Sequence, residues 1–285
     1  MTNAKQKKWL FRALLERNPD LFQANSYAIW IQPVRHFIAQ VWVNSCRDPS
    51  MFSPSLSLTP LYWGGASIHS DIGSFSELFS REPPPAPFTR EYFLQPECDL
   101  QPDYPQLAAW GQTIGHWELT VPEIDQIFTR AVEEQVLPLL RPMALDHRAY
   151  LAFYHSYLVP HGGLHDGQRM AIALAEGALD EARAVFARLW ERHETDRYGD
   201  YEPPEPLVYP KRGTRTRSAM EAWDKASDCI QYRDERRRIL EIAEPLRTGD
   251  RAAIAAILHR WEAEAVRIHK VERYWEPTPF PIEED

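Results

Sequence analysis

Residues 36–61, HFIAQVWVNSCRDPSMFSPSLSLTPL, carry the clearest strand pattern in the sequence and decide the predicted fold. Apolar side chains take every second position from Phe37 to Val43, and polar and apolar residues alternate cleanly from Ser55 to Thr59. Alternation with a period of two residues is typical of strands that bury one face. A third alternating run lies just upstream, between Ser26 and Gln32. Three such runs joined by short turns predict an antiparallel β-meander.

Helical patterns flank this meander on both sides. Apolar residues four positions apart predict a helix over residues 5–17. Beyond the meander, a short strand is predicted around residues 116–119, and a second helix follows it. Thr120 as N-cap, with Glu123 three residues later, has the spacing of a capping box. We expect this second helix to end near Leu137-Pro138, where proline interrupts the pattern.

From Gly167 onward the predicted regular elements are all helices. A stripe of apolar residues at spacings of three and four marks a helix over residues 180–195. A polar linker follows, and Ser218 is the expected N-cap of a long helix that Pro245 bounds. The pair Gly249-Asp250 then fits a helix C-terminus followed by the N-cap of a last helix.

A faint internal echo relates two parts of this helical region. Residues 173–193, ALAEGALDEARAVFARLWERH, resemble residues 245–265, PLRTGDRAAIAAILHRWEAEA, each with a glycine turn and an Ala-rich face. Two antiparallel helical hairpins would bury these faces against each other. The fold class is therefore α+β: an antiparallel β-meander packed with helices, followed by an all-α helical-hairpin region. We expect an α+β domain over residues 1–145 and a helical region with a proline-rich tail over 146–285.

Composition narrows the class of partner. The chain has 285 residues, of which 44% are hydrophobic and 12% aromatic, enough for one large domain or two ordinary ones. The net charge is −9 and the pI is about 5.6. A uniformly acidic protein is repelled by phosphate backbones, so we expect no nucleic-acid partner. An acidic surface would instead suit a basic protein.

Cysteine usage and hydropathy point to the cytoplasm. The three cysteines, Cys46, Cys98 and Cys229, form neither a disulfide framework nor a zinc pattern, and reduced thiols are expected. The N-terminal stretch has no apolar core of signal-peptide length, and no run approaches the roughly 20 apolar residues of a membrane span. We therefore expect a cytoplasmic protein with no membrane partner.

Two charged or aromatic clusters have structural interpretations. Arg233, Arg236, Arg237 and Arg238 lie on the predicted long helix, interrupted by acidic residues, and we expect a salt-bridged, solvated face. The segment YWEPTPFPIEED, residues 274–285, alternates aromatic residues with prolines. It could dock in a partner, but folding back over its own helices is the favoured interpretation.

The best candidate for metal chemistry is the segment around His161, His165 and Asp166. Two imidazoles and a carboxylate could coordinate a metal ion, and this would allow a metal-assisted hydrolase. The spacing matches no standard zinc motif, and the glycines between the histidines argue against a helix that holds both rings on one face. The common phosphate-binding glycine motifs are absent, and we expect no cofactor.

The order of these parts resembles bacterial proteins of unassigned function found among the immunity proteins of polymorphic toxin systems. The resemblance rests on the first helix, the segments FIAQVWVNS and SLSLTPLYW, the segment IFTRAVEEQVLPLL and the helix ALAEGALDEARAVFARLW. It implies a stoichiometric binder that blocks a toxin and is not a catalyst. The class shares no site motif, so no functional residue is carried over from it.

The sequence thus favours an acidic, cytosolic protein-binding module. Its more specific form is an immunity protein that occludes the active site of a basic toxin domain. Its negative charge, its many tryptophans and tyrosines and its lack of a catalytic motif support this hypothesis. The predicted partner-binding residues lie in the acidic linker: Asp196, Asp200, Tyr201, Glu202 and Glu205. A metal-assisted hydrolase that uses the His161 region is the alternative.

Overall fold

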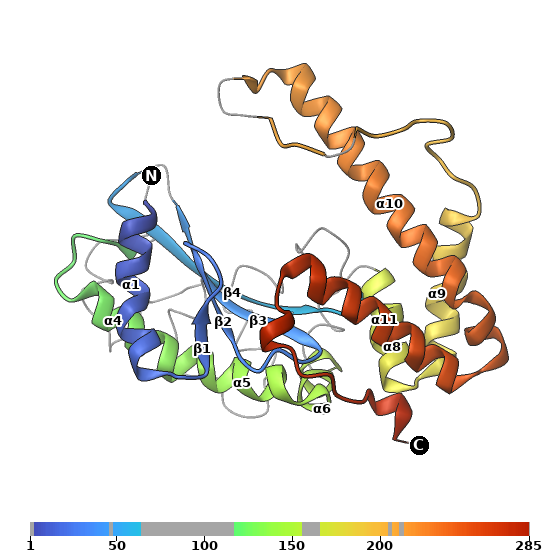
Figure 1. Cartoon of the computed structure of the whole chain (residues 1–285), viewed down its shortest axis with the longest axis horizontal. Coiled ribbons are helices and arrows are strands. Elements are labelled where there is room, and N and C mark those ends of the chain that lie inside the picture. The colour runs from blue at the N-terminus through green and yellow to red at the C-terminus, as the bar shows by residue number, and fades with distance from the viewer. Residues whose placement is uncertain are drawn as a thin grey trace. The chain divides into compact units, whose positions relative to one another are not determined.

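The computed structural model describes residues 3–45, 48–63, 117–155, 166–204, 207–210 and 214–284 (Figure 1). These residues form two compact units. The first, here called the sheet unit, contains the described residues up to 61, then 117–155 and 269–279. The second, the helical unit, contains residues 62–63, the described residues of 166–268, and 280–284. Each unit is therefore assembled from segments that are far apart in the sequence.

Among the described residues, the sheet unit is built on a five-stranded antiparallel sheet in which the strands follow their order in the chain. The strands are β1 (Leu21–Gln23), β2 (Ala28–Ile31), β3 (Phe37–Ser45), β4 (Met51–Pro60) and β5 (Trp117–Glu118). The predicted meander corresponds to β2, β3 and β4. The α+β fold class is therefore confirmed.

The register of β3 against β4 runs from Phe37 opposite Pro60 to Ser45 opposite Phe52. The alternation of β4 predicts one solvent-facing side, yet Ser55, Ser57 and Thr59 are all buried. Cross-strand side-chain hydrogen bonds satisfy two of these hydroxyls. The Gln40 amide donates to Ser57 Oγ at 2.8 Å, and the Asn44 amide donates to Ser55 Oγ at 3.2 Å. The polar side chains of β4 from Ser55 to Thr59 are thus buried, and those of Ser55 and Ser57 are hydrogen-bonded to β3.

Helices pack onto the sheet through a cluster of aromatic rings. The α-helices that the structure describes in the sheet unit are α1 (Ala4–Arg17), α4 (Ile124–Ala131), α5 (Leu137–Leu145) and α6 (His147–Phe153). Phe128 of α4 lies with its ring centroid 6.1 Å from Phe11 of α1 and 6.0 Å from Phe52 of β4. The start of α1 is fixed by a capping box between Asn3 and Gln6. The predicted first helix is confirmed.

The helix after β5 differs from the prediction at both ends. Glu123 has a left-handed backbone at φ 59° and makes no side-chain cap bond, so the Thr120–Glu123 capping box does not form. The helix also does not end near Leu137-Pro138. It continues through a π-helical turn, η2 (Val132–Val136), directly into α5, and Pro138 lies in the turn that follows η2.

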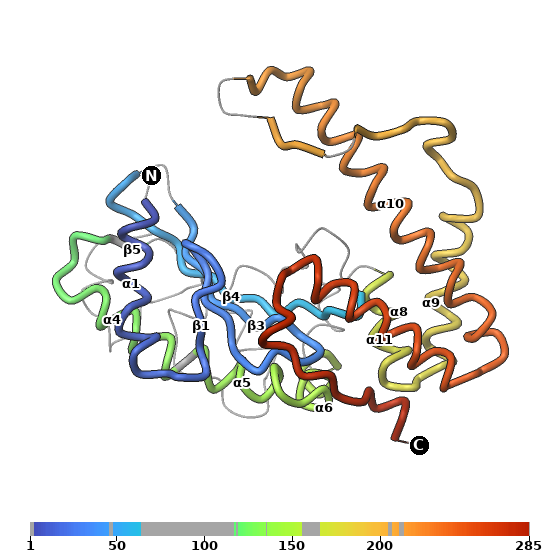
Figure 2. The backbone as a smooth tube through the Cα atoms, viewed as in Figure 1, coloured from blue at the N-terminus to red at the C-terminus, as the bar shows by residue number. Residues whose placement is uncertain are grey.

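The helical unit consists of two hairpins, which Figure 2 traces as tubes. Its helices are α8 (Asp166–Glu176), α9 (Leu179–His193), α10 (Arg217–Thr248) and α11 (Arg251–His269). The turns use Gly177 at φ 82° and Gly249 at φ 71°, values that favour glycine. Asp250 Oδ1 accepts the Ala253 N–H at 2.9 Å, as its predicted capping role requires.

Two predictions about α10 were wrong. Its N-cap is Thr216, whose hydroxyl accepts the Ala219 N–H at 3.1 Å, and Ser218 lies inside the helix. Pro245 does not bound the helix, which runs on to Thr248 before the Gly249 cap. The last turn tolerates the proline, and the side-chain hydroxyl of Thr248 donates to the carbonyls of Glu244 and Pro245.

The C-terminal segment folds back, as predicted, but onto strand residues as well as helices. In the sheet unit, the Val34 N–H donates to the Tyr274 carbonyl, and the Glu276 N–H donates to the Val34 carbonyl, both at 2.8 Å. The ring of Tyr274 stacks on Phe22 at a centroid distance of 3.6 Å. Farther along, Phe280 is buried in the helical unit against Tyr62, with ring centroids 5.2 Å apart.

Candidate functional site

The most distinctive surface feature of the helical unit is the first half of α10 with the segment beside it. We call residues 196–204, 207–210 and 214–216 the strap, and the strap together with residues 217–232 of α10 the arm. Figure 1 shows the strap returning along α10 before the helix begins. The second half of α10 instead packs in the hairpin bundle. Arg236 Nε donates to the His193 carbonyl of α9 at 3.0 Å, for example.

The strap leaves α9 through a tight, charged turn. The Asp196 carboxylate accepts the Tyr198 N–H at 2.9 Å and lies 3.0 Å from Arg233 Nε. The backbone hydrogen bond, followed by the Arg233 guanidinium, holds the pKa of Asp196 below its usual value. Arg233 also donates to the Gly199 carbonyl at 2.9 Å, where φ is 52°. This turn fixes the direction of the backbone where the strap leaves α9.

Cation–aromatic contacts then secure the strap to α10. The Arg197 guanidinium lies 4.6 Å from the ring centroid of Tyr232, and Lys225 Nζ lies 4.1 Å from that of Tyr201. Tyr232 also donates its hydroxyl to the Thr195 carbonyl at 2.6 Å. Such contacts contribute about 0.5–1 kcal/mol each at exposed sites. Several together order a segment that has no regular secondary structure.

At the far end of the strap, two apolar side chains stay exposed. Val208 is 65% exposed and Tyr209 is 47% exposed. The Tyr209 ring meets Trp223 of α10 edge-on at 4.8 Å, and the Arg215 guanidinium lies 4.9 Å from the same ring. Arg215 Nε also donates to the Pro210 carbonyl at 3.1 Å. The two exposed residues are therefore presented on a supported backbone.

The acidic residues predicted to bind a partner fall into different roles. Asp196 and Glu202 both form ion pairs with Arg233 inside the protein. Asp196 Oδ2 lies 3.0 Å from Arg233 Nε, and Glu202 Oε2 lies 3.6 Å from Arg233 Nη1. Tyr201 is half-buried under Lys225. Asp200 is exposed and makes no ion pair with the part of the chain that the structure describes. Glu205 lies outside the described residues.

The predicted metal site is described only at Asp166. His161 and His165 lie outside the described residues. The Asp166 carboxylate, at the start of α8, accepts hydrogen bonds from two arginines of α9. Arg188 Nη2 lies 3.0 Å from Oδ1, and Arg192 Nη2 lies 2.7 Å from Oδ2. Burial alone raises the pKa of this carboxyl, but the two guanidinium groups outweigh burial and lower it. Within the described ranges, no three His, Cys, Asp or Glu residues group as metal ligands.

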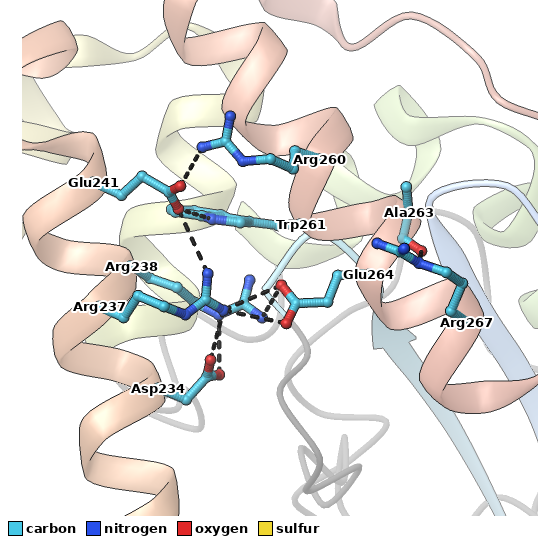
Figure 3. A network of polar contacts seen from close by, with 9 residues as sticks. All are labelled: Asp234, Arg237, Arg238, Glu241, Arg260, Trp261, Ala263, Glu264 and Arg267. Carbon is cyan, nitrogen blue, oxygen red and sulfur yellow. Dashed lines mark hydrogen bonds and ion pairs between the residues drawn. The ribbon is translucent and has the colours of Figure 1, made fainter.

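A charged network joins α10 to α11 (Figure 3). The Glu241 carboxylate accepts hydrogen bonds from Arg260 and from Trp261 Nε1, and Arg237 lies 2.7 Å from Asp234 and 3.1 Å from Glu264. The outer part of the network matches the predicted salt-bridged face.

Arg238 departs from that prediction because it is only 1% exposed. Its guanidinium lies 5.1 Å from Trp261 and 6.0 Å from Trp63, and its Nε donates to Asp234 at 3.1 Å. A buried cation with aromatic planes and a carboxylate around it stabilises the hairpin; it is not presented to a ligand.

Buried histidines form a third polar group, in the sheet unit. The rings of His36 and His147 lie 5.3 Å apart, and His36 Nε2 is 3.0 Å from Thr278 Oγ1. Desolvation lowers the pKa of His147 to about 3, so this ring is neutral at physiological pH. A neutral, enclosed imidazole here contributes to the core.

Sequence reasoning missed Val208, Tyr209 and Trp223 as a group. A signal existed: three adjacent residues, Leu207, Val208 and Tyr209, form an apolar and aromatic run in a polar, proline-bearing linker. The approach of Trp223 could not be predicted, because it depends on how the strap runs along α10.

No protein-family model, no curated protein and no solved structure matches this chain. None of the described helices combines the length and the apolar character needed to span a membrane.

Proposed function

We propose that this protein is a protein-binding module and that the arm is its interface. The observation that carries the proposal is the exposed pair Val208 and Tyr209, held in place by Trp223 and Arg215. Exposed apolar and aromatic side chains on an ordered backbone bind with little loss of conformational freedom, and aromatic residues are enriched among binding hot spots.

The partner that suits this surface is a basic protein. The net charge of the chain is −9. On the arm, Asp200, Asp224 and Asp228 are exposed and form no ion pair with other described residues. These carboxylates would attract a basic partner and orient it on the apolar pair. The resemblance to immunity proteins supports a more specific form, in which the module occludes the active site of a toxin.

Affinity capture followed by calorimetry tests this proposal. The intact chain would be used to capture a partner from the lysate of its native organism, and the partner would then be purified. We expect Val208→Asp to weaken binding by about thirtyfold, or roughly 2 kcal/mol, because it places a charge at the centre of the interface. Asp200→Lys with Asp228→Lys should slow association and reduce its dependence on salt.

Leu240→Asp is the matched control. Leu240 lies on the same helix and is 45% exposed, but it is outside the arm. This variant should bind as the wild type does. The arm is excluded as the interface if Val208→Asp binds the partner with unchanged affinity. It is also excluded if Leu240→Asp weakens binding as much as Val208→Asp does.

A further inference from the structure

The segment Phe280–Glu283 occupies a defined seat in the helical unit. Phe280 is fully buried, and its ring centroid lies 5.2 Å from that of Tyr62 and 4.7 Å from that of His259. The short turn η6 (Pro281–Glu283) lies against α8, and Arg251 Nε of α11 donates to the Ile282 carbonyl at 3.4 Å. An aromatic ring is thus inserted between helices by a segment of only a few residues.

The polar contacts of this segment converge on one histidine. Glu283 Oε2 accepts the Phe280 N–H at 2.6 Å and lies 2.8 Å from His259 Nε2. The other ring nitrogen of His259, Nδ1, lies 3.6 Å from the fully buried carboxylate of Glu262. A protonated imidazole has an N–H on each nitrogen and can serve both carboxylates, whereas a neutral ring has only one N–H.

We propose that residues 280–283 form a latch that His259 holds closed while its ring carries both protons and releases as it loses one. The charged groups that face the ring are Glu262, on the same helix, and Glu283, on the latch itself. When the ring becomes neutral, both carboxylates lose its positive charge, and only one of the two can still face a ring N–H. Opening the latch uncovers the apolar seat formed at Tyr62. This inference does not depend on the arm.

The sign of the pH dependence follows from these contacts. The carboxylate of Glu262, followed by that of Glu283, raises the pKa of His259, and together they outweigh the opposing effect of burial. Because the closed latch favours the protonated ring, the added stability is complete below the ordinary histidine pKa of about 6.5. It is lost as pH rises through the raised pKa. The latch therefore closes in acid and loosens in mild alkali.

Hydrogen exchange on the full-length protein tests the latch. Protection factors of the Phe280, Glu283 and Glu284 amides would be measured from pH 5.5 to 9 and corrected for the intrinsic pH dependence of exchange. These amides donate hydrogen bonds within the closed latch. We expect a fall of about tenfold for each unit by which the closed-state pKa exceeds that of the open state.

Variants separate the proposed mechanism from simple packing. Glu283→Gln keeps an oxygen that can accept the Phe280 N–H but removes the charge, so the midpoint of the pH profile should move toward about 6.5. His259→Gln should make the profile flat. Glu272→Gln, an equal charge change at an exposed position of the same C-terminal region, should preserve the wild-type profile.

The proposal is overturned if wild-type protection is constant across this pH range, or if its pH dependence persists in His259→Gln. Should that variant fail to fold, an unmoved midpoint in Glu283→Gln would overturn it equally.

Discussion

His147 shows how strongly a single position can depend on its surroundings. Its ring lies 5.3 Å from Phe37 and from His36, in the core of the sheet unit. Desolvation is the main cause of its low pKa, about 3, and the neighbouring His36 adds to the effect. The folded state therefore keeps this ring unprotonated at pH values where the same ring in the unfolded chain, with a pKa of about 6.5, would bind a proton.

This exclusion predicts acid sensitivity of the sheet unit. Because the folded pKa lies below the unfolded one, the unfolded state binds the extra proton, and stability is lost as pH falls from about 6.5 toward 3. We expect His147→Leu to reduce the pH slope of the unfolding free energy by about 1.4 kcal/mol per pH unit in this range.

Chemical unfolding at a series of pH values, followed by tryptophan fluorescence, measures that slope. His155→Gln, at an exposed position eight residues farther along the chain, is the control variant. Equal slopes for His147→Leu and the wild type would show that the buried ring does not contribute.

The sequence could not predict which polar residues are buried. Alternation in β4 implies that Ser55, Ser57 and Thr59 face water, and the pattern around Arg238 implies a solvated helix face. All four are buried. Cross-strand amides contact Ser55 and Ser57, and two tryptophans lie against Arg238. Such environments come from residues distant in sequence, and local patterns carry no information on them.

At the scale of elements, the two glycine turns give the helical unit its hairpins. A Cβ at Gly177 would lie 2.8 Å from Arg251 Nη2, and one at Gly249 would lie 3.3 Å from Arg183 Nη2. Each turn is thus approached by an arginine of the other hairpin. Both contacts involve the ends of flexible side chains, so the larger cost of substitution comes from the positive φ angles.

We predict that Gly177→Ala and Gly249→Ala each destabilise the helical unit by about 1 kcal/mol, because alanine resists the left-handed region. Gly199→Asn is a useful comparison: φ there is 52°, no atom lies within 4 Å of the added Cβ, and asparagine tolerates this conformation. It should cost less. Urea unfolding monitored by circular dichroism gives all three values, and wild-type stability of both alanine variants would contradict the prediction.

Element identity was more predictable than element ends. Period-two and period-three-to-four patterns correctly indicated the meander, α1, α9, α10 and α11. The caps at Thr120 and Ser218 were wrong because several nearby residues could have served, and the choice depends on where the preceding chain arrives. In the candidate site, the linker between α9 and α10 could be predicted from its charge. The contact between Tyr209 and Trp223 could not be predicted, because it depends on how the strap runs along α10.

At the scale of the whole molecule, the C-terminal region contributes to both compact units. Residues 269–279 belong to the sheet unit, where the Val34 amide donates to the Tyr274 carbonyl, and residues 280–284 belong to the helical unit. The division expected from the sequence, at residue 145, separates two contiguous stretches of chain. The compact units follow contacts between distant segments, which no local sequence pattern reveals.

Two truncations separate these contributions. A chain ending at Lys270 lacks the Tyr274 and Trp275 contacts, so the Val34 amide should lose its protection from hydrogen exchange. A chain ending at Pro279 keeps these contacts and should retain that protection while losing the Phe280 seat. Equal protection of Val34 in both chains would show that the segment does not stabilise the sheet unit.

The π-helical turn between α4 and α5 has a consequence for evolutionary comparison. Its backbone bonds reach one residue farther than those of an α-helix: the Leu137 N–H donates to the carbonyl of Val132, five positions earlier, so the wide turn accommodates one extra residue. Such a turn can arise from a single-residue insertion that would otherwise rotate every later side chain by about 100°. A related chain with a regular helix here would be one residue shorter. An alignment should then place its gap within residues 132–136, which keeps Leu140 and Met143 paired with their counterparts.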